Sequence, residues 1–232
     1  MKIFLNANDE DFQNKTFSTT FTTNLEVALQ KLYAEVKEAV VNENVSIVIL
    51  DDRTVSKESK IIPMAMAVGY INHKLQNDKI RSTVSIVAVT SEVYDPHSAA
   101  VLIAFGVAVI YPYMMYASAV ALYERKEVSR YEMQRVLKNT QKALNAGLLK
   151  IMSKMGICTI ASYRNSRLFD VIGLSDPIIE DCFTDSQSEL NGLTYEDIDE
   201  RLSQNHKSAF REDGFNKIFP LNIGGFYKFY SG

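Results

Sequence analysis

Two adjacent carboxylates are the first place where this chain could do chemistry. Asp51 and Asp52 directly follow a short apolar run at 46–50, and Arg53 comes next. A β-branched apolar run of this length is typical of a strand that is buried on both faces of a parallel sheet. Ligands of such sheets bind just outside the carboxyl ends of the strands, and carboxylate oxygens suit Mg²⁺. The position suggests a ligand site, but the same acids would also serve as solvated strand-end charges, one of them paired with Arg53.

A receiver-like phosphoacceptor site would need a further aspartate and a lysine at the ends of later strands. The apolar run at 84–89 ends instead in Thr90-Ser91-Glu92, and the run at 107–110 ends in Tyr111-Pro112. The pattern therefore favours charged side chains at strand ends over a metal-dependent active site.

A second group of reactive side chains follows the next strand-like run. Asp95, His97 and Ser98 would give a hydrolase an acid, an imidazole and a hydroxyl, but no G-x-S-x-G elbow surrounds a serine. The sequence also has neither of the glycine-rich phosphate-binding motifs. We interpret Asp95 or Ser98 as the N-cap of the following helix.

The elements that position these residues alternate between two kinds of pattern. Strand-like runs at 46–50, 84–89 and 107–110 are interleaved with helical patterns over 24–41, 63–77 and 96–105. This alternation predicts an α/β fold with a mostly parallel sheet built from right-handed βαβ units.

Further helix and strand signals follow from local chemistry. Thr23–Glu26 and Ser129–Glu132 have capping-box spacing, and the second opens a long amphipathic pattern that Gly156 is expected to end. The run at 157–161 predicts a fourth strand, in which the Cys158 thiol would be a buried and unreactive hydrophobe.

The pattern becomes acidic and rich in turns toward the carboxyl end. Helices are predicted near 176–183 and 194–210, and a strand over 226–230. We therefore expect an α/β domain over 1–174 and a peripheral helical segment over 175–232, and we interpret the chain as part of a longer polypeptide.

Composition excludes several classes of protein. The 232 residues are 47% apolar and 23% charged, as in globular domains, and the net charge of −3 argues against general nucleic-acid binding. The two cysteines form no CxxC pair, which argues against a disulfide framework or a structural metal. With no signal-peptide or membrane-spanning pattern, we expect a cytoplasmic protein that binds no membrane.

Longer stretches of the sequence resemble a known family. The segments GLLKIMSKMGICTIASYR at 147–164 and LFDVIGL at 168–174 resemble the large subunit of glutamate synthase, where its central domain leads into its FMN-binding domain. Residues 49–53, 62–69 and 95–113 agree with the same alignment.

The resemblance implies a parent enzyme that releases ammonia from glutamine and adds it to 2-oxoglutarate, so that two glutamates form. It places FMN and an iron–sulfur cluster elsewhere in that enzyme, with FAD and NAD(P)H on a partner subunit in the bacterial type. The chain itself would hold no catalytic residue, cofactor or metal. Its partners would be the glutaminase and FMN-binding domains of the same polypeptide, and the small subunit.

Two sets of candidate site residues follow. The resemblance suggests that residues at the domain junction contact the synthase domain or line the ammonia path, unless they only complete the fold: Lys150, Ser153, Lys154, Met155, Thr159, Ser162, Tyr163 and Arg164. The alternative is a stand-alone regulatory or receiver-like module with a ligand or Mg²⁺ at the strand ends: Asp51, Asp52, Arg53, Asp95 and His97.

Overall fold

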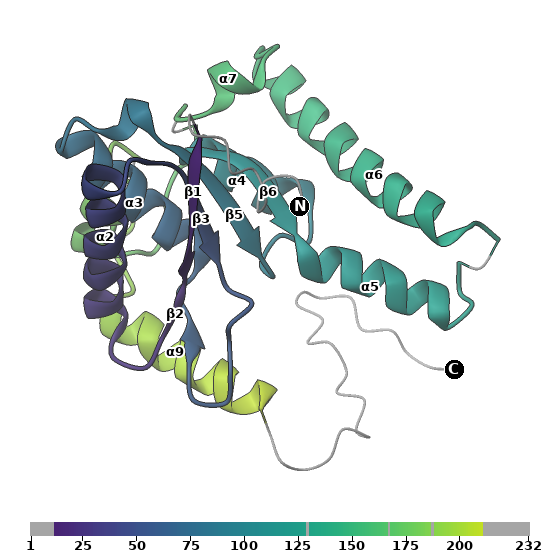
Figure 1. The fold of residues 1–232 in the computed structure, drawn as a ribbon, viewed down its shortest axis with the longest axis horizontal. Helices are drawn as coiled ribbons and strands as arrows, with labels where there is room; N and C mark the ends of the chain where they lie inside the picture. Colours follow the sequence, from purple (N-terminus) through teal and green to yellow (C-terminus); the bar gives the residue numbers. More distant parts are fainter. Residues whose placement is uncertain (1–11, 129, 167, 187, 211–232) are drawn as a thin grey trace.

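The protein is an α/β structure built on one parallel sheet. The computed structural model describes residues 12–128, 130–166, 168–186 and 188–210 (Figure 1). Its main sheet has the strand order β1-β3-β5-β6, with every neighbouring pair parallel. The strands are β1 (Gln13–Ser18), β3 (Val45–Asp51), β5 (Ser85–Thr90) and β6 (Val107–Pro112), and a separate antiparallel pair comprises β2 (Thr20–Phe21) and β4 (Lys60–Ile61). The predicted fold class is confirmed.

Each strand of the main sheet is joined to the next by a helix. These helices are α2 (Leu25–Asn42), α3 (Met64–Asn77) and α4 (Pro96–Ala104), with a short 3₁₀ turn η1 (Arg81–Thr83) before β5. The spatial order of the strands follows the chain order, and right-handed crossovers then put all three helices on one face. In agreement, α3 contacts both α2 and α4 (Figure 1).

Strand β3 is buried on both faces, as its uninterrupted apolar sequence predicts. Val48 and Leu50 belong to the main core beneath the helices. Ile49 points the other way and packs with Val87 and Val89 on the opposite face. Successive side chains of a strand alternate between faces, so a strand covered on both sides needs an apolar residue at every position.

Both predicted capping boxes are wrong in detail, although both helices exist. The N-cap of α2 is Asn24, whose side-chain oxygen accepts a hydrogen bond from the Val27 amide at 2.9 Å. The long helix α6 (Met133–Lys154) begins after Glu132, later than its capping box predicts, and Ser129 lies outside the described residues. Asparagine and threonine are similarly good N-cap residues. With Thr23 and Asn24 adjacent, the sequence therefore leaves the first residue of α2 uncertain by one position. Gly156 follows α6 with φ +71°, as expected.

The predicted strand at 157–161 is wrong. Thr159 instead accepts a hydrogen bond from the Ser162 amide at 3.3 Å and caps the short helix α7 (Ile160–Tyr163). Tyr163 then packs with Ala100 and Ala104 of α4. Cys158 is consequently exposed rather than buried, because the strand that would cover it does not form.

Strand β1 and helix α5 (Tyr113–Glu124) are among the elements that were not predicted from the sequence. Strand β1 is polar at most positions, and helix α5 has no side-chain cap at its start. Both are defined by tertiary contacts: β1 pairs along its length with β3, and α5 packs against α6.

The two predicted C-terminal helices are present as α8 (Asp176–Cys182) and α9 (Tyr195–Ala209). Helix α8 lies so close to α3 that a Cβ on Gly69 would fall 1.8 Å from the Cys182 carbonyl oxygen. Helix α9 lies against α2 and β4, where Lys60 pairs with Asp199 at 2.6 Å. The strand predicted at 226–230 lies outside the described residues. Among the helices of the described ranges, none is both long and apolar enough to cross a membrane.

Candidate functional site

The Asp51 carboxylate at the end of β3 is held by its neighbour. Arg53 donates from Nε to Asp51 Oδ1 at 2.9 Å and from Nη2 to Asp51 Oδ2 at 2.5 Å, and the Arg53 amide donates a further bond of 2.9 Å to Oδ1. This bidentate contact raises the pKa of the Arg53 guanidinium, because the charged form is the one that donates. The predicted pairing with Arg53 is therefore confirmed, but the carboxylate is buried, not solvated as expected.

Asp52 is fully buried and fastens the end of β3 to the end of β5. Its Oδ2 accepts from the Thr90 hydroxyl at 2.8 Å, the Ser91 amide at 2.9 Å and the Ser91 hydroxyl at 3.1 Å. Burial raises the pKa of the nearby Tyr113 phenol to about 12, and the Asp52 carboxylate adds to the rise. A buried carboxylate needs such donors; the chain supplies them for Oδ2, whereas the buried Oδ1 has no hydrogen-bond partner among the described residues.

Asp95 and His97 serve the start of α4. Asp95 is the N-cap and accepts from the Ser98 amide at 2.7 Å, as predicted, and the Ser98 side-chain hydrogen bond holds the pKa of the carboxyl below its usual range. The His97 ring lies edge-on to Phe169, with 5.4 Å between ring centroids. Within the described ranges, no three His, Cys, Asp or Glu side chains are grouped as metal ligands would be.

The candidate junction residues divide into a surface group and one buried side chain. Seven lie on the surface at the end of α6 and around α7: Lys150, Ser153, Lys154, Met155, Thr159, Ser162 and Arg164. Tyr163 is fully buried, and its hydroxyl has no hydrogen-bond partner among the described residues. The surface group could make contacts with another protein, whereas Tyr163 anchors α7 to α4.

Sequence reasoning missed a partly buried arginine close to this segment. Arg81 donates to the Asn72 side chain, the Val84 carbonyl and the Gly106 carbonyl at 2.5, 2.6 and 2.8 Å. Burial, helped by the positive charge of Arg164, lowers the pKa of Arg81 to about 10. Arg81 thereby ties η1 and α3 to the start of β6. Its partners are an amide and two backbone carbonyls, and no sequence motif marks such contacts.

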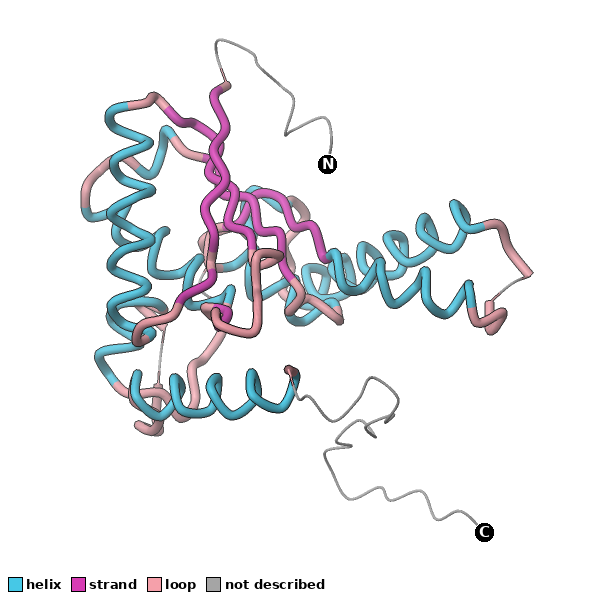
Figure 2. The backbone as a smooth tube through the Cα atoms, turned by 60° about the horizontal axis from the view of Figure 1, so that its bottom comes forward, coloured by secondary structure: helices cyan, strands magenta, loops and turns pink. Residues whose placement is uncertain are grey.

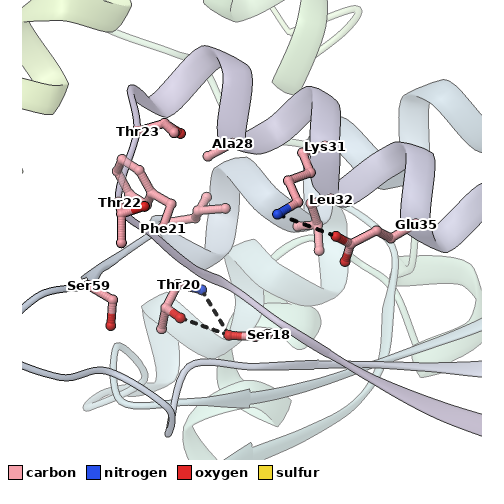
Figure 3. A pocket seen from close by; sticks show the side chains of 11 residues that line it. Ser18, Thr20, Phe21, Thr22, Thr23, Ala28, Lys31, Leu32, Glu35 and Ser59 are labelled. Carbon is pink, nitrogen blue, oxygen red and sulfur yellow. Dashed lines mark hydrogen bonds and ion pairs between the residues drawn. The ribbon is translucent and has the colours of Figure 1, made fainter.

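A cavity of about 240 Å³ opens where β2 and the segment after β4 meet α2 (Figure 3). Hydroxyl side chains such as Ser18, Thr20 and Ser59 line one side, and Ser18 accepts a bond from the Thr20 amide. Lys31 and Glu35 lie on the helix side, 3.9 Å apart and exposed. The charges at this cavity are therefore already paired with each other.

The fold and the strand-end geometry together define an α/β domain in which Asp51 and one oxygen of Asp52, at the carboxyl edge of the sheet, are hydrogen-bonded within the chain. Residues 1–175 match the family model for the glutamate synthase central domain. The chain belongs to that family, and the resemblance seen in the sequence is confirmed.

Individual relatives agree with this assignment. The chain is 29% identical over 212 residues to the glutamate synthase (NADPH) large chain of Bacillus subtilis. It is 31% identical over 240 residues to ferredoxin-dependent glutamate synthase 1 of Arabidopsis thaliana, and 28% identical over 202 residues to glutamate synthase (NADH) of Schizosaccharomyces pombe. The matches cover 90%, 97% and 86% of this chain, but only 14%, 15% and 10% of those proteins.

Proposed function

We propose that this chain is the central structural domain of a glutamate synthase that converts glutamine and 2-oxoglutarate, with reducing equivalents, into two glutamates. Relatives named for NADPH, NADH and ferredoxin all contain a similar region. A role common to such enzymes cannot depend on the electron donor. Holding the glutaminase and synthase domains in position is such a role, because ammonia must pass between them without loss to water.

One observation favours a structural role for this chain over a catalytic one. The carboxylates at the ligand-binding edge of the sheet are bonded mainly within the chain: Asp51 to Arg53, and Asp52 Oδ2 to Thr90 and Ser91, while Asp52 Oδ1 is buried without a hydrogen-bond partner among the described residues. A Mg²⁺ ion at Asp51 would have to displace a bidentate guanidinium, so this geometry disfavours the receiver-like alternative.

We place the cofactors of the enzyme outside this chain. An iron–sulfur cluster requires several thiolates close together. The sequence has only Cys158 and Cys182; the first is exposed, and burial raises the pKa of the second to about 12, so that it stays a thiol. These residues do not fit a cluster. FMN would belong to the synthase domain, and FAD with NAD(P)H to a small subunit.

We further propose that residues 1–174 form the central domain proper and that 175–232 leads toward the FMN-binding domain. The exposed group from Lys150 to Arg164 would then face the synthase domain, at the point where the chain leaves α6. The glutaminase domain and a small subunit are the other expected partners, in a cytoplasmic enzyme.

The test uses the whole enzyme that contains this domain. Charge reversal of two exposed lysines in K150E/K154E should let glutamine hydrolysis exceed glutamate formation, because ammonia escapes when the domains separate. The matched control K31E reverses an exposed lysine on α2 and should leave the two rates coupled. If an enzyme lacking residues 46–174 still couples both reactions fully, the scaffold role is wrong.

A second test uses the chain by itself. We expect its melting temperature to be unchanged by FMN, 2-oxoglutarate, glutamine or Mg²⁺. A rise of several degrees with one of these ligands would mean that the chain contains a binding site of its own, and would contradict a purely structural role.

A further inference from the structure

Helices α5 and α6 form an arm, residues 113–154, that extends beyond the sheet. Figure 2 shows the two helices side by side, projecting away from the strands. Of the 22 residues of α6 only Val136 and Met152 are buried, and of the 12 residues of α5 only Ala119. Most side chains of the α5–α6 arm are therefore at least partly exposed, although one side of α6 contacts α4.

The charge on α6 has one sign. The helix contains no aspartate or glutamate, and its five cations are all exposed: Arg135, Lys138, Lys142, Lys150 and Lys154. None of the five forms an ion pair with a described residue. The whole chain carries a net charge of −3, so this concentration of positive charge is local. A helix with so many unpaired cations complements an acidic surface.

An aromatic cleft borders this positive face. It has a volume of about 610 Å³ and is lined by Tyr111, Tyr113 and Tyr116 on one side and by Leu137 and Lys138 of α6 on the other. None of the described residues that line it is acidic. Tyrosine rings with an adjacent cation favour an apolar or aromatic side chain that is flanked by carboxylates.

Lys138 belongs to both the positive charge of α6 and the tyrosine cleft. It lies at the edge of the cleft, and Lys142, four residues further along, lies on the same side of the helix. The exposed Leu149, seven residues after Lys142, also lies on that side. A helix of this length spans about 33 Å, which is long enough to present a continuous contact surface.

We propose that the α5–α6 arm docks an acidic protein surface, with an apolar side chain of the partner seated in the tyrosine cleft beside Lys138. The inference does not rest on the proposed function, because the charge and the cleft are present whichever protein supplies the partner. A membrane is disfavoured, since the apolar side of α6 is already packed on α4 and α5 and cannot enter a lipid interface. Nucleic acid is disfavoured by the overall negative charge.

The test measures binding of a fluorescent 16-residue peptide, of alternating Glu and Asp with one central Phe, to the 232-residue chain. We expect saturable binding that weakens as salt rises. The exposed double variant K138E/K142E should bind about tenfold more weakly, because two attractions become repulsions. The variant A117E, which adds a carboxylate at the cleft rim, should weaken binding to a similar extent.

The controls separate docking from general charge effects. K31E/K207E reverses two exposed lysines on α2 and α9 and should leave the affinity within about twofold, because neither lies on the arm. A peptide with Ser in place of Phe should bind several-fold more weakly. Unchanged thermal melting of each variant shows that the fold is intact.

Several outcomes would overturn the proposal. Equal peptide binding by the parent chain and K138E/K142E would show that the α6 lysines are not the contact. Tighter binding of phosphatidylserine vesicles or duplex DNA than of the peptide, with loss in the same variant, would assign the arm to a different class of partner. A dimer of the chain that K138E/K142E dissociates would show that a second copy covers the arm.

Discussion

Helices α2 and α6 have similar amphipathic sequences, but they bury very different amounts of side chain. Helix α2 lies along the sheet and buries seven of its 18 residues: Leu25, Ala28, Leu29, Leu32, Val36, Ala39 and Val40. Helix α6 is longer, with 22 residues, and buries only Val136 and Met152. Periodicity therefore identifies which side of a helix is apolar, but not how much of that side the fold covers.

The polar groups of the sheet and of the α5–α6 arm differ in the same way as the apolar ones: those of the sheet make more contacts within the chain. In the sheet body, formed by the four parallel strands with α2, α3 and α4, the carboxylates of Asp51 and Asp52 and the Arg81 guanidinium are all bonded within the chain. On the α5–α6 arm, the α6 lysines have no ion pair with a described residue. The body bonds these three charged groups internally, although Asp52 Oδ1 is left without a hydrogen-bond partner among the described residues, whereas the arm presents its charges to its surroundings.

The largest expected contrast between body and arm concerns leucine packing. Leu29 of α2 is fully buried, so Leu29→Ala should lower the free energy of unfolding by about 3 to 4 kcal/mol. Leu149 of α6 is 63% exposed, and Leu149→Ala should change it by less than about 0.5 kcal/mol. Urea unfolding at constant m-value measures both. Equal losses would mean that the arm is packed as tightly as the body.

Two glycines test how closely each region is packed. A Cβ on Gly69 of α3 would meet a backbone oxygen at 1.8 Å, and one on Gly147 of α6 would meet the Pro96 ring at 2.2 Å. We expect Gly69→Ala to cost about 3 kcal/mol and Gly147→Ala about 1 kcal/mol, because α6 can shift away from α4 more easily than α8 can leave α3. A gain in stability for Gly147→Ala, from its better helix propensity alone, would show that α6 does not press on α4.

The buried carboxylate at the sheet edge provides the third contrast. Asp52→Ala leaves the Thr90 hydroxyl and two Ser91 donors without their acceptor and should cost about 2 kcal/mol. Glu132→Ala is the matched change on the arm, because Glu132 precedes α6 without a side-chain capping bond, and should cost less than about 0.5 kcal/mol. A similar loss in both variants would contradict a structural role specific to Asp52.

The smallest effect concerns α4, the helix that touches both regions. Asp95→Ala removes its N-cap and should cost about 1 kcal/mol at neutral pH. The pKa of this carboxyl is lowered in the folded protein, so its contribution is present above the unfolded value of about 4 and disappears as pH falls through the folded pKa. Thermal melting of both proteins at neutral and strongly acidic pH should show the difference shrinking. A difference that persists in acid would mean that Asp95 acts other than as an anionic cap.

Much of the sheet body could be predicted from the sequence, because its signals are local. The β-branched run around Val48 matched a strand buried on both faces, and the pairing of Asp51 with Arg53 followed from their adjacency. Strand β1 could not be predicted, because an edge strand with polar residues such as Lys15 and Thr16 is defined by the backbone bonds it makes to β3. Only part of the candidate site could be predicted, for the same reason. The pairing of Asp51 with Arg53 is local, whereas the hydrogen-bond partners of Asp52 come from the end of another strand.

The sequence by itself determined the fold class, the three crossover helices and the family, because apolar periodicity and a long similar segment are carried by neighbouring residues. Only the tertiary structure decided that residues 157–161 form no strand and that α5 and α6 leave the sheet as an arm. A β-branched run becomes a strand only where another strand pairs with it, and an amphipathic helix is covered only where other elements lie against it. Such contacts join residues far apart in the chain, and no local pattern records them.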